Sequence, residues 1–149
     1  MSQTEPAAYP QPPPLADEQL ETFLGQAPIA RLGTHNEDGT IHIAPIWFEF
    51  TGGQLLMPTQ DITRKVNNIK RNNQVTVLID TQEPPYTGVL IYGKAALDYD
   101  DVFRKKTSIY LKYFAEEDAP DPQKLARRFK PVVIRITPER IVTFGEGDN

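Results

Sequence analysis

One hydroxyl and two cations stand side by side at residues 63–65, as Thr63-Arg64-Lys65. No acidic residue occurs between Asp61 and Asp80, although the whole chain carries a formal net charge of -4. The apolar residues that follow recur at helical spacing, which predicts a helix beginning at this point. A helix start offers unpaired backbone N–H groups and the positive end of the helix dipole. The chemistry expected of this group is therefore the binding of a phosphate or another anion.

Local chemistry leaves two interpretations of this group open. In the first, Thr63 caps the helix and Asp61 points away, so the N–H groups remain available to a phosphate. In the second, the Asp61 carboxylate takes those N–H groups, and Arg64 and Lys65 are ordinary solvated charges.

The other side chains exclude several kinds of chemistry. The chain has no cysteine and two histidines, so it lacks a disulfide scaffold, a thiol nucleophile and a Cys-based metal site. Its two serines, Ser2 and Ser108, lie outside any nucleophile elbow, and no glycine-rich nucleotide loop is present. We therefore assign no catalytic residue and no metal ligand, and a bound cofactor would have to supply any reactivity.

Composition predicts how the chain is organised. Residues 1–14 hold five prolines and few apolar side chains, which is typical of an extended arm. Residues 15–149 have a length suited to a single domain. Without a membrane-spanning run or a signal-peptide pattern, we expect a cytoplasmic protein with no membrane partner. The net charge of -4 argues against a general nucleic-acid partner.

Periodicity predicts the elements that position residues 63–65. Helices are expected at 15–24, from Ile62 to Ile69, after Asp98 with an aromatic face packed on the sheet (Phe103, Thr107, Tyr110 and Phe114), and at 123–129. Strands are expected at 29–34, 41–50, 55–57 with an end at Pro58, 75–79, 89–97, and at 132–136 and 141–144 on either side of Pro138. Pro45 predicts an edge strand or a bulge, and Gly93 predicts a kink. The set predicts a mainly β fold, a closed or nearly closed antiparallel barrel with peripheral helices.

Several short motifs recur in an order and spacing that we can match to a known family. They are Ile29–Leu32 with Gly33-Thr34, Asp38-Gly39, Pro45-Ile46-Trp47-Phe48, Gly52-Gly53, Thr63-Arg64-Lys65, Asn72-Asn73-Gln74-Val75 and Gly93-Lys94-Ala95. Over roughly residues 16–97, the chain resembles the pyridoxamine 5'-phosphate oxidase-like, split β-barrel flavin-binding proteins. This resemblance implies an antiparallel split β-barrel of the FMN-binding type, in which two protomers hold FMN at their interface.

The resemblance also implies roles for particular residues. Arg64 and Lys65 would hold the flavin phosphate, Thr63 and Thr59 would add hydrogen bonds, and Pro58 would lie beside the ring. The strand that runs along the isoalloxazine and ribityl chain would contribute backbone groups and the Trp47 region, from Ile43, Ala44, Pro45, Ile46, Trp47 and Phe48. From the residues alone, Trp47 either faces its own core in a monomer or belongs to an apolar patch with Pro45 and Phe48. A second copy would cover that patch, and we expect the homodimer.

The chain also departs from some members of that family. Members that oxidise pyridoxamine phosphate have a glutamine where this chain has Gly88, and a C-terminal segment containing arginine where this chain reads GEGDN at 145–149. The C-terminal histidine of haem-degrading relatives is missing as well. We expect an FMN-binding oxidoreductase acting on a small-molecule substrate of unknown identity. The alternatives are a deazaflavin-dependent reductase of the same fold, a non-enzymatic flavin carrier or sensor, and a nucleic-acid-binding barrel that uses Arg64, Lys65, Lys70 and Arg71.

Overall fold

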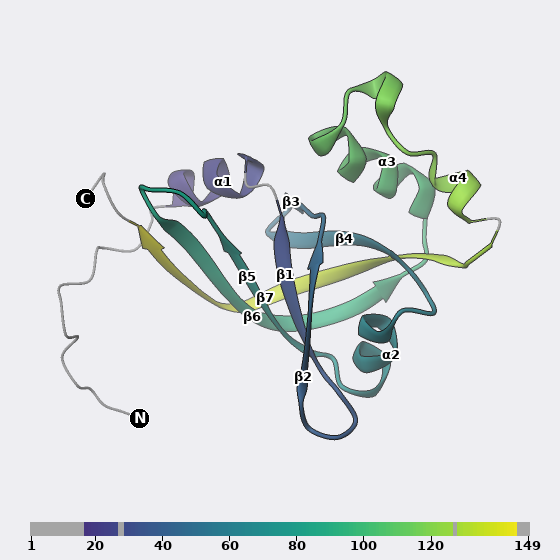
Figure 1. Cartoon of the computed structure of the whole chain (residues 1–149), viewed down its shortest axis with the longest axis horizontal. Coiled ribbons are helices and arrows are strands. Elements are labelled where there is room, and N and C mark those ends of the chain that lie inside the picture. The colour runs from purple at the N-terminus through teal and green to yellow at the C-terminus, as the bar shows by residue number, and fades with distance from the viewer. Residues whose placement is uncertain (1–16, 27–28, 127, 146–149) are drawn as a thin grey trace.

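A computed structural model of the chain describes residues 17–26, 29–126 and 128–145, so the predicted arm at 1–14 lies outside the described residues. These residues form one antiparallel sheet with the strand order β2-β1-β5-β6-β7-β4-β3 (Figure 1). Its strands are β1 (Ala30–His35), β2 (Ile41–Ile46), β3 (Glu49–Thr51), β4 (Gln54–Gln60), β5 (Gln74–Asp80), β6 (Thr87–Asp98) and β7 (Pro131–Gly145). The helices are α1 (Asp17–Gln26), α2 (Arg64–Arg71), α3 (Val102–Tyr113) and α4 (Pro122–Leu125), with a 3-10 turn at Glu116–Asp118.

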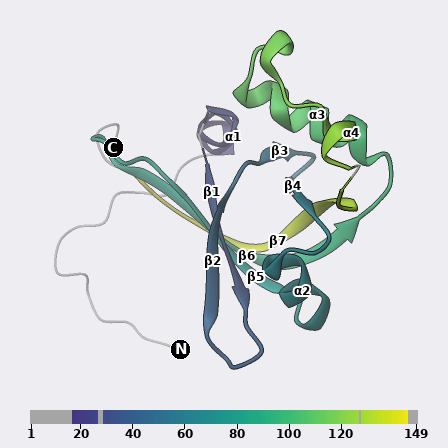
Figure 2. The same cartoon turned by 45° about the vertical axis from the view of Figure 1, so that its right-hand side comes forward.

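The sheet is curled into a half-barrel whose two end strands, β2 and β3, have a neighbour on one side only. In Figures 1 and 2 the β1–β2 hairpin crosses β6 and β7 at a steep angle, and α3 and α4 lie together away from the hairpin loop. Alternate strand residues fill the inner face, among them Leu32, Met57 and Ile91, and none of these three is exposed to solvent. Leu24 of α1 and Val66 of α2 join the same core cluster. The predicted antiparallel barrel with peripheral helices is confirmed, in an open form.

The predicted strand at 41–50 is two strands, because the chain leaves the sheet at Trp47 and Phe48. The Tyr113 hydroxyl of α3 accepts a hydrogen bond from the Phe48 N–H at 3.0 Å and lies 3.2 Å from the Phe48 carbonyl oxygen, to which it can donate. The Tyr113 side chain therefore makes the hydrogen bonds to Phe48 that a neighbouring strand would otherwise make. Pro45 lies on β2, an end strand of the sheet, so the edge position predicted for it is confirmed.

Two prolines that we expected to end or interrupt strands lie inside them. Pro58 is within β4, and Pro138 is within the single long strand β7. β3 pairs only with residues 54–56 of β4, and β4 pairs with β7 only as far as Ile136. Each proline thus has a neighbouring strand on one side only, so its missing N–H can face the free side without loss of a ladder bond.

Gly93 lies at the predicted kink, and the neighbouring strand is the reason for it. The register of β6 with β7 shifts between Tyr92 and Gly93. A Cβ atom on Gly93 would lie 2.4 Å from the carbonyl oxygen of Thr137, so only glycine allows β7 to approach this closely.

The helices differ from prediction in their bounds and in their buried faces. α2 begins at Arg64, which leaves Ile62 outside it and 61% exposed, whereas Val66 and Ile69 are buried as expected. The aromatic face predicted for α3 is only partly right, because Tyr110 is buried but Phe103 is exposed. The buried residues of α3 are Lys106, Ile109 and Tyr110. α4 ends at Leu125, earlier than the predicted 129, and α1 continues past the predicted end to Gln26. Among the described residues, no helix has the length and apolar character needed to cross a membrane.

Candidate functional site

The start of α2 agrees with the first of the two interpretations, in which Thr63 is the N-cap residue and Asp61 points away. Thr63 is the N-cap residue, with extended backbone angles (φ -68, ψ 157), and its side chain does not cap the helix. Instead, the Thr63 hydroxyl donates to the Gln60 carbonyl at 3.1 Å and lies 3.5 Å from the Thr59 hydroxyl. The first N–H groups of α2 therefore keep no side-chain cap, and two hydroxyls lie beside them.

Asp61 points away from the helix start. Its carboxylate accepts a hydrogen bond from the Tyr99 hydroxyl at 2.5 Å and forms an ion pair with Lys70 at 3.2 Å. The Tyr99 hydrogen bond, supported by Lys70, lowers the pKa of Asp61 and raises the pKa of Tyr99 to about 12. Asp61 is thus ionised and bonded elsewhere, which leaves the N–H groups available.

Arg64 and Lys65 form no ion pair with any described residue. The Arg64 side chain is exposed, and Lys65 is half-buried. Burial lowers the pKa of Lys65, because the ammonium gives up part of its hydration without gaining a carboxylate. An anionic ligand would supply the missing countercharge.

A cavity of about 250 Å³ lies beside Lys65, where β2 faces β4 across the open side of the half-barrel. We call it the slit; its lining residues are Ile29, Pro45, Ile46, Trp47, Pro58 and Lys65. All but Ile29 belong to the predicted cofactor set, although they come from β2, β4, α2 and the break after β2. Mostly apolar walls with a single ammonium suit a flat apolar ring that carries an anionic group.

The remaining predicted residues lie outside the slit lining. Ile43 is on the outer face of β2 and 66% exposed, and Ala44 precedes the slit on the same strand. Thr59 is buried next to Thr63, at the helix start. Phe48 is fully buried, and its N–H and carbonyl both bond to Tyr113. The expectation that Phe48 contributes to an exposed patch is therefore wrong.

Trp47 packs against α3 of its own chain. Its ring stacks on Tyr113 (centroids 5.6 Å apart, interplanar angle 26°) and meets Tyr110 and Phe114 edge-on at 5.6 and 5.2 Å. The expected patch of Pro45, Trp47 and Phe48 is consequently not a free surface, because α3 covers most of it. One face of Trp47 still lines the slit.

Two lysines of α3 that we did not predict as site residues lie close to the slit residues. The Lys106 ammonium is 1% exposed and donates to the Thr59 carbonyl at 2.6 Å. The Lys112 ammonium donates to the Leu24 carbonyl at 3.0 Å and the Phe48 carbonyl at 3.2 Å, and lies 3.4 Å from the centre of the Phe48 ring. Burial lowers the pKa of both lysines to about 8. Helical spacing gave a signal for Lys106, which falls three and four residues before Ile109 and Tyr110.

These two lysines give the protein a characteristic pH dependence. Between pH about 8 and their ordinary pKa of 10.5, Lys106 and Lys112 bind more protons in the unfolded chain than in the folded one. The free energy of unfolding should therefore rise with pH across this range and lose that contribution as pH falls through 8. Urea denaturation at a series of pH values measures it. The double variant Lys106→Met, Lys112→Met should show a smaller rise, and an equal slope in both proteins would contradict the assignment.

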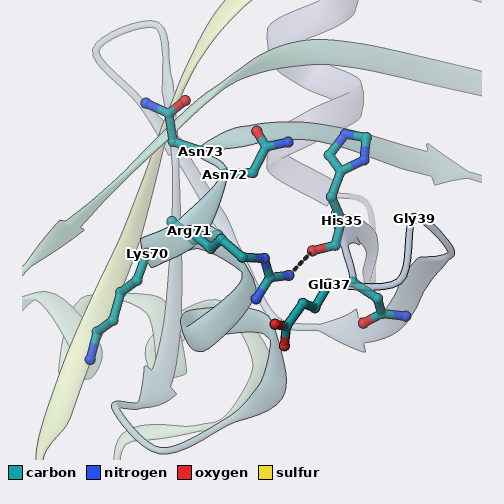
Figure 3. Close-up of a pocket in the computed structure, with 9 residues that line it drawn as sticks. His35, Glu37, Gly39, Lys70, Arg71, Asn72 and Asn73 are labelled. Atoms are coloured by element: carbon teal, nitrogen blue, oxygen red, sulfur yellow. Dashed lines mark hydrogen bonds between the residues drawn. The ribbon is translucent and has the colours of Figure 1, made fainter.

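A larger cavity, of about 720 Å³, lies at the other end of α2 and is lined by residues of that end and of the β1–β2 turn. Figure 3 shows Arg71 directed at the His35 carbonyl beside Glu37, whereas the Lys70 side chain points away from both. Arg71 donates to the His35 carbonyl at 2.6 Å and to Asn68 at 3.0 Å. Lys70 is paired with Asp61, and Glu37 adds a negative charge. These contacts tie the β1–β2 turn to α2 and engage both cations, Lys70 with a carboxylate and Arg71 with two neutral oxygen acceptors.

Comparison with known proteins supplies the remaining evidence. The family model for pyridoxamine 5'-phosphate oxidase matches residues 16–144, whereas no curated protein matches the chain. Among solved structures, the conserved hypothetical protein Rv2991 of Mycobacterium tuberculosis is similar, with a TM-score of 0.75 and 19% identity over 88% of this chain and 85% of that one. A candidate pyridoxamine 5'-phosphate oxidase of Listeria innocua gives a TM-score of 0.67 and 27% identity, with coverages of 85% and 95%. An F420 reductase gives 0.69 and 23%, with coverages of 81% and 94%.

Proposed function

Because the chain belongs to the pyridoxamine 5'-phosphate oxidase family, we propose that it is a flavin-dependent oxidoreductase that binds FMN in the slit. One observation carries the proposal: Pro45, Trp47 and Pro58 form an apolar slit that ends at Lys65, on a helix start with free N–H groups. Bound FMN would supply the redox chemistry. The chain's own part is to hold the phosphate, orient the ring and exclude water from one side of it.

All the predicted residues except Phe48 have a role in this proposal. Arg64, Lys65 and the N–H groups at the start of α2 would bind the phosphate, and the Thr63 and Thr59 hydroxyls would add hydrogen bonds. The ring would lie along the slit beside Pro58, and the free edge of β2 would offer backbone groups to its polar atoms. That edge runs through Ile43, Ala44, Pro45 and Ile46 as far as Trp47, whereas the Phe48 N–H and carbonyl already bond to Tyr113 and Lys112.

We propose further that the protein works as a homodimer in the cytoplasm, with one flavin site at each side of the interface. Support comes from the outer face of the sheet, where Ile41, Ile43, Tyr92 and Phe144 are exposed. A face of this kind is typical of a surface that a second copy covers. Nucleic acid is not expected as a partner, since Lys70 and Arg71 are already bonded within the chain.

A deazaflavin coenzyme is the second candidate for the slit. The similarity to an F420 reductase, at a TM-score of 0.69, favours it as an alternative, because F420 is a deazaflavin. Both cofactors combine a flat ring with a phosphate, so the slit and the start of α2 would serve either one.

Gly88 argues against pyridoxamine phosphate as the substrate. A Cβ atom on Gly88 would lie 2.1 Å from the Phe144 ring, so Phe144 lies directly across this glycine. The glutamine expected at this position in oxidases of the resembled family would displace that ring. We propose a different small-molecule substrate.

The absorption spectrum of the freshly purified protein, with mass spectrometry of the released cofactor, tests the proposal. We expect a flavin spectrum, the mass of FMN and reduction of the bound flavin by a nicotinamide donor. Retention of a deazaflavin would establish the second candidate, and bound FMN without any turnover would indicate a carrier or sensor. A chain that binds no flavin when FMN is added would refute the proposal. Oxidation of pyridoxamine phosphate at about one per second or faster would overturn the substrate argument.

A further inference from the structure

α3 contacts both walls of the slit through charged groups that have no carboxylate partner. Lys106 bonds to the carbonyl of Thr59, the residue after Pro58 in the β4 wall. Lys112 bonds to the carbonyl of Phe48, the residue after Trp47 in the opposite wall. The two lysines are six residues apart on one helix, so a single rigid element joins the two walls.

We propose that Lys106 and Lys112 are positioning residues that fix the spacing of the slit and the orientation of Trp47. The role of the slit as a flavin site rests on the proposed function, whereas the positioning of Trp47 does not. The Lys106 ammonium donates to the Thr59 carbonyl, on the part of β4 that extends beyond β3. The Lys112 ammonium donates to the Phe48 carbonyl, in the break between β2 and β3. Charge-assisted bonds of this kind are stronger than neutral ones, so the walls depend on the protonated lysines.

Tyr113 strengthens this arrangement on the Trp47 side. Its hydroxyl bonds the Phe48 backbone while its ring stacks on Trp47, so α3 holds both the backbone and the side chain at the break between β2 and β3. Lys112 also lies 5.2 Å from the centre of the Tyr113 ring. Loss of the Lys112 charge would therefore change the surroundings of Trp47 through Tyr113, which contacts both side chains.

The other charged groups on the elements around α3 are either bonded within the chain or exposed. β3 contributes Glu49, which accepts hydrogen bonds from Ser108 at 2.9 and 3.1 Å and favours the charged form of Lys112. Asp98 pairs with Lys105 at 2.7 Å and with Arg135 of β7 at 3.5 Å. β4 has no charged residue, and α4 carries the exposed Lys124. α1 offers the Leu24 carbonyl, and its acids Asp17, Glu18 and Glu21 are exposed. Burial raises the pKa of Tyr110 and of Tyr113 above 10.0, so neither phenol ionises where the lysines do.

Trp47 is the only tryptophan of the chain, so its fluorescence reports the slit directly. In the cofactor-free protein, we expect the Trp47 emission to change with pH with a midpoint of about 8, as Lys112 loses its charge. Lys112→Met should shift the emission at neutral pH and remove this transition. Lys112→Arg should keep the neutral-pH emission and remain charged through the transition. Arg104→Met, an exposed change on the same helix, is the matched control and should behave as wild type.

Lys65→Met removes the other ammonium beside the slit. This variant should retain the pH-dependent change in Trp47 emission, which would assign that change to Lys112. For FMN titrated into the cofactor-free proteins, we expect affinity to fall about tenfold in Lys112→Met and in Lys106→Met, with rescue by Lys112→Arg. Unchanged Trp47 emission and FMN affinity in both Met variants would overturn the positioning role, as would a transition that persists in Lys112→Met and disappears in Lys65→Met. A wild-type chain that binds no FMN but shows the Lys112-dependent emission change would refute the flavin site and leave the positioning of Trp47 intact.

Discussion

Replacing Arg64 and Lys65 together by alanine should weaken FMN binding by roughly two orders of magnitude or more. Each charge-assisted contact to a phosphate contributes about 1.5–3 kcal/mol, and every 1.4 kcal/mol or so changes affinity about tenfold. The two side chains have no ion-pair partner in the described chain, so the change removes ligand contacts and leaves no buried charge behind. The fold should therefore survive, as circular dichroism and thermal unfolding can verify.

The same helix provides a matched control for this double change. Lys70→Ala with Arg71→Ala removes the same two charges from the other end of α2, where the side chains bond to Asp61 and to the His35 carbonyl. We expect this control to lose some stability and keep its FMN affinity, as measured by titration of the cofactor-free protein. Equal losses in both pairs would mean that general positive charge attracts the flavin, and unchanged affinity in the first pair would exclude the start of α2 as the phosphate site. RNA or DNA binding that both pairs abolish would instead favour the nucleic-acid alternative.

The parts of the site that follow one another in the sequence could be predicted, because their signals are local. A run of three polar residues before a helical pattern is enough to locate the start of α2, and Thr63 lies at the cap as one interpretation required. The choice between Thr63 and Asp61 could not be made from the sequence. It depends on Tyr99, 38 residues later, whose hydroxyl holds the Asp61 carboxylate.

Strand ends were predicted less well where a proline occurred, for a physical reason. Proline removes a backbone donor, but this matters only if a neighbouring strand needs it. Pro58 and Pro138 each lie where one side of the strand is free, and that depends on how far β3 and β4 extend. The length of a neighbouring strand is a property of the whole sheet, which residues next to the proline do not reveal.

The position of Trp47 could not be predicted either, because it too depends on residues that are distant in the sequence. Alternation places Ile41 and Ile43 on one face of the strand and Ile46 on the other, and the structure exposes the first two and buries Ile46. It could not predict that the chain leaves β2 at Trp47, because the break is stabilised by Tyr113 and Lys112 from a helix more than sixty residues away. The aromatic residue that we assigned to a dimer surface therefore packs within its own chain.

The surface that remains for a second copy is the outer face of the sheet. The strand register places Ile43 of β2, Gly33 of β1, Thr76 of β5 and Tyr92 of β6 in one row across this face. A mostly apolar hollow of about 370 Å³ lies along the row, between Arg31 and His35, and Ile41, Ile43 and Leu78 contribute its apolar walls. This face adjoins the slit through Pro45, which follows Ile43 by two residues on the same side of β2. A partner docked here would lie next to the open side of the slit and could close it.

Ile43→Glu should separate the two chains and release the flavin. The side chain is 66% exposed in the single chain, so a carboxylate there would be solvated in the monomer and buried without a partner in the dimer. Burying an unpaired charge costs several kcal/mol, which weakens association by roughly a hundredfold or more. Sedimentation velocity at micromolar concentration measures the dimer, and flavin absorbance in the same run measures occupancy. Ile62→Glu is the matched control for association, since Ile62 is 61% exposed but lies beside α2 and away from the row, and we expect it to leave the dimer unchanged. If Ile43→Glu gives a monomer that still holds FMN, the slit of one chain is sufficient. If it leaves the dimer intact, the partner contacts another surface.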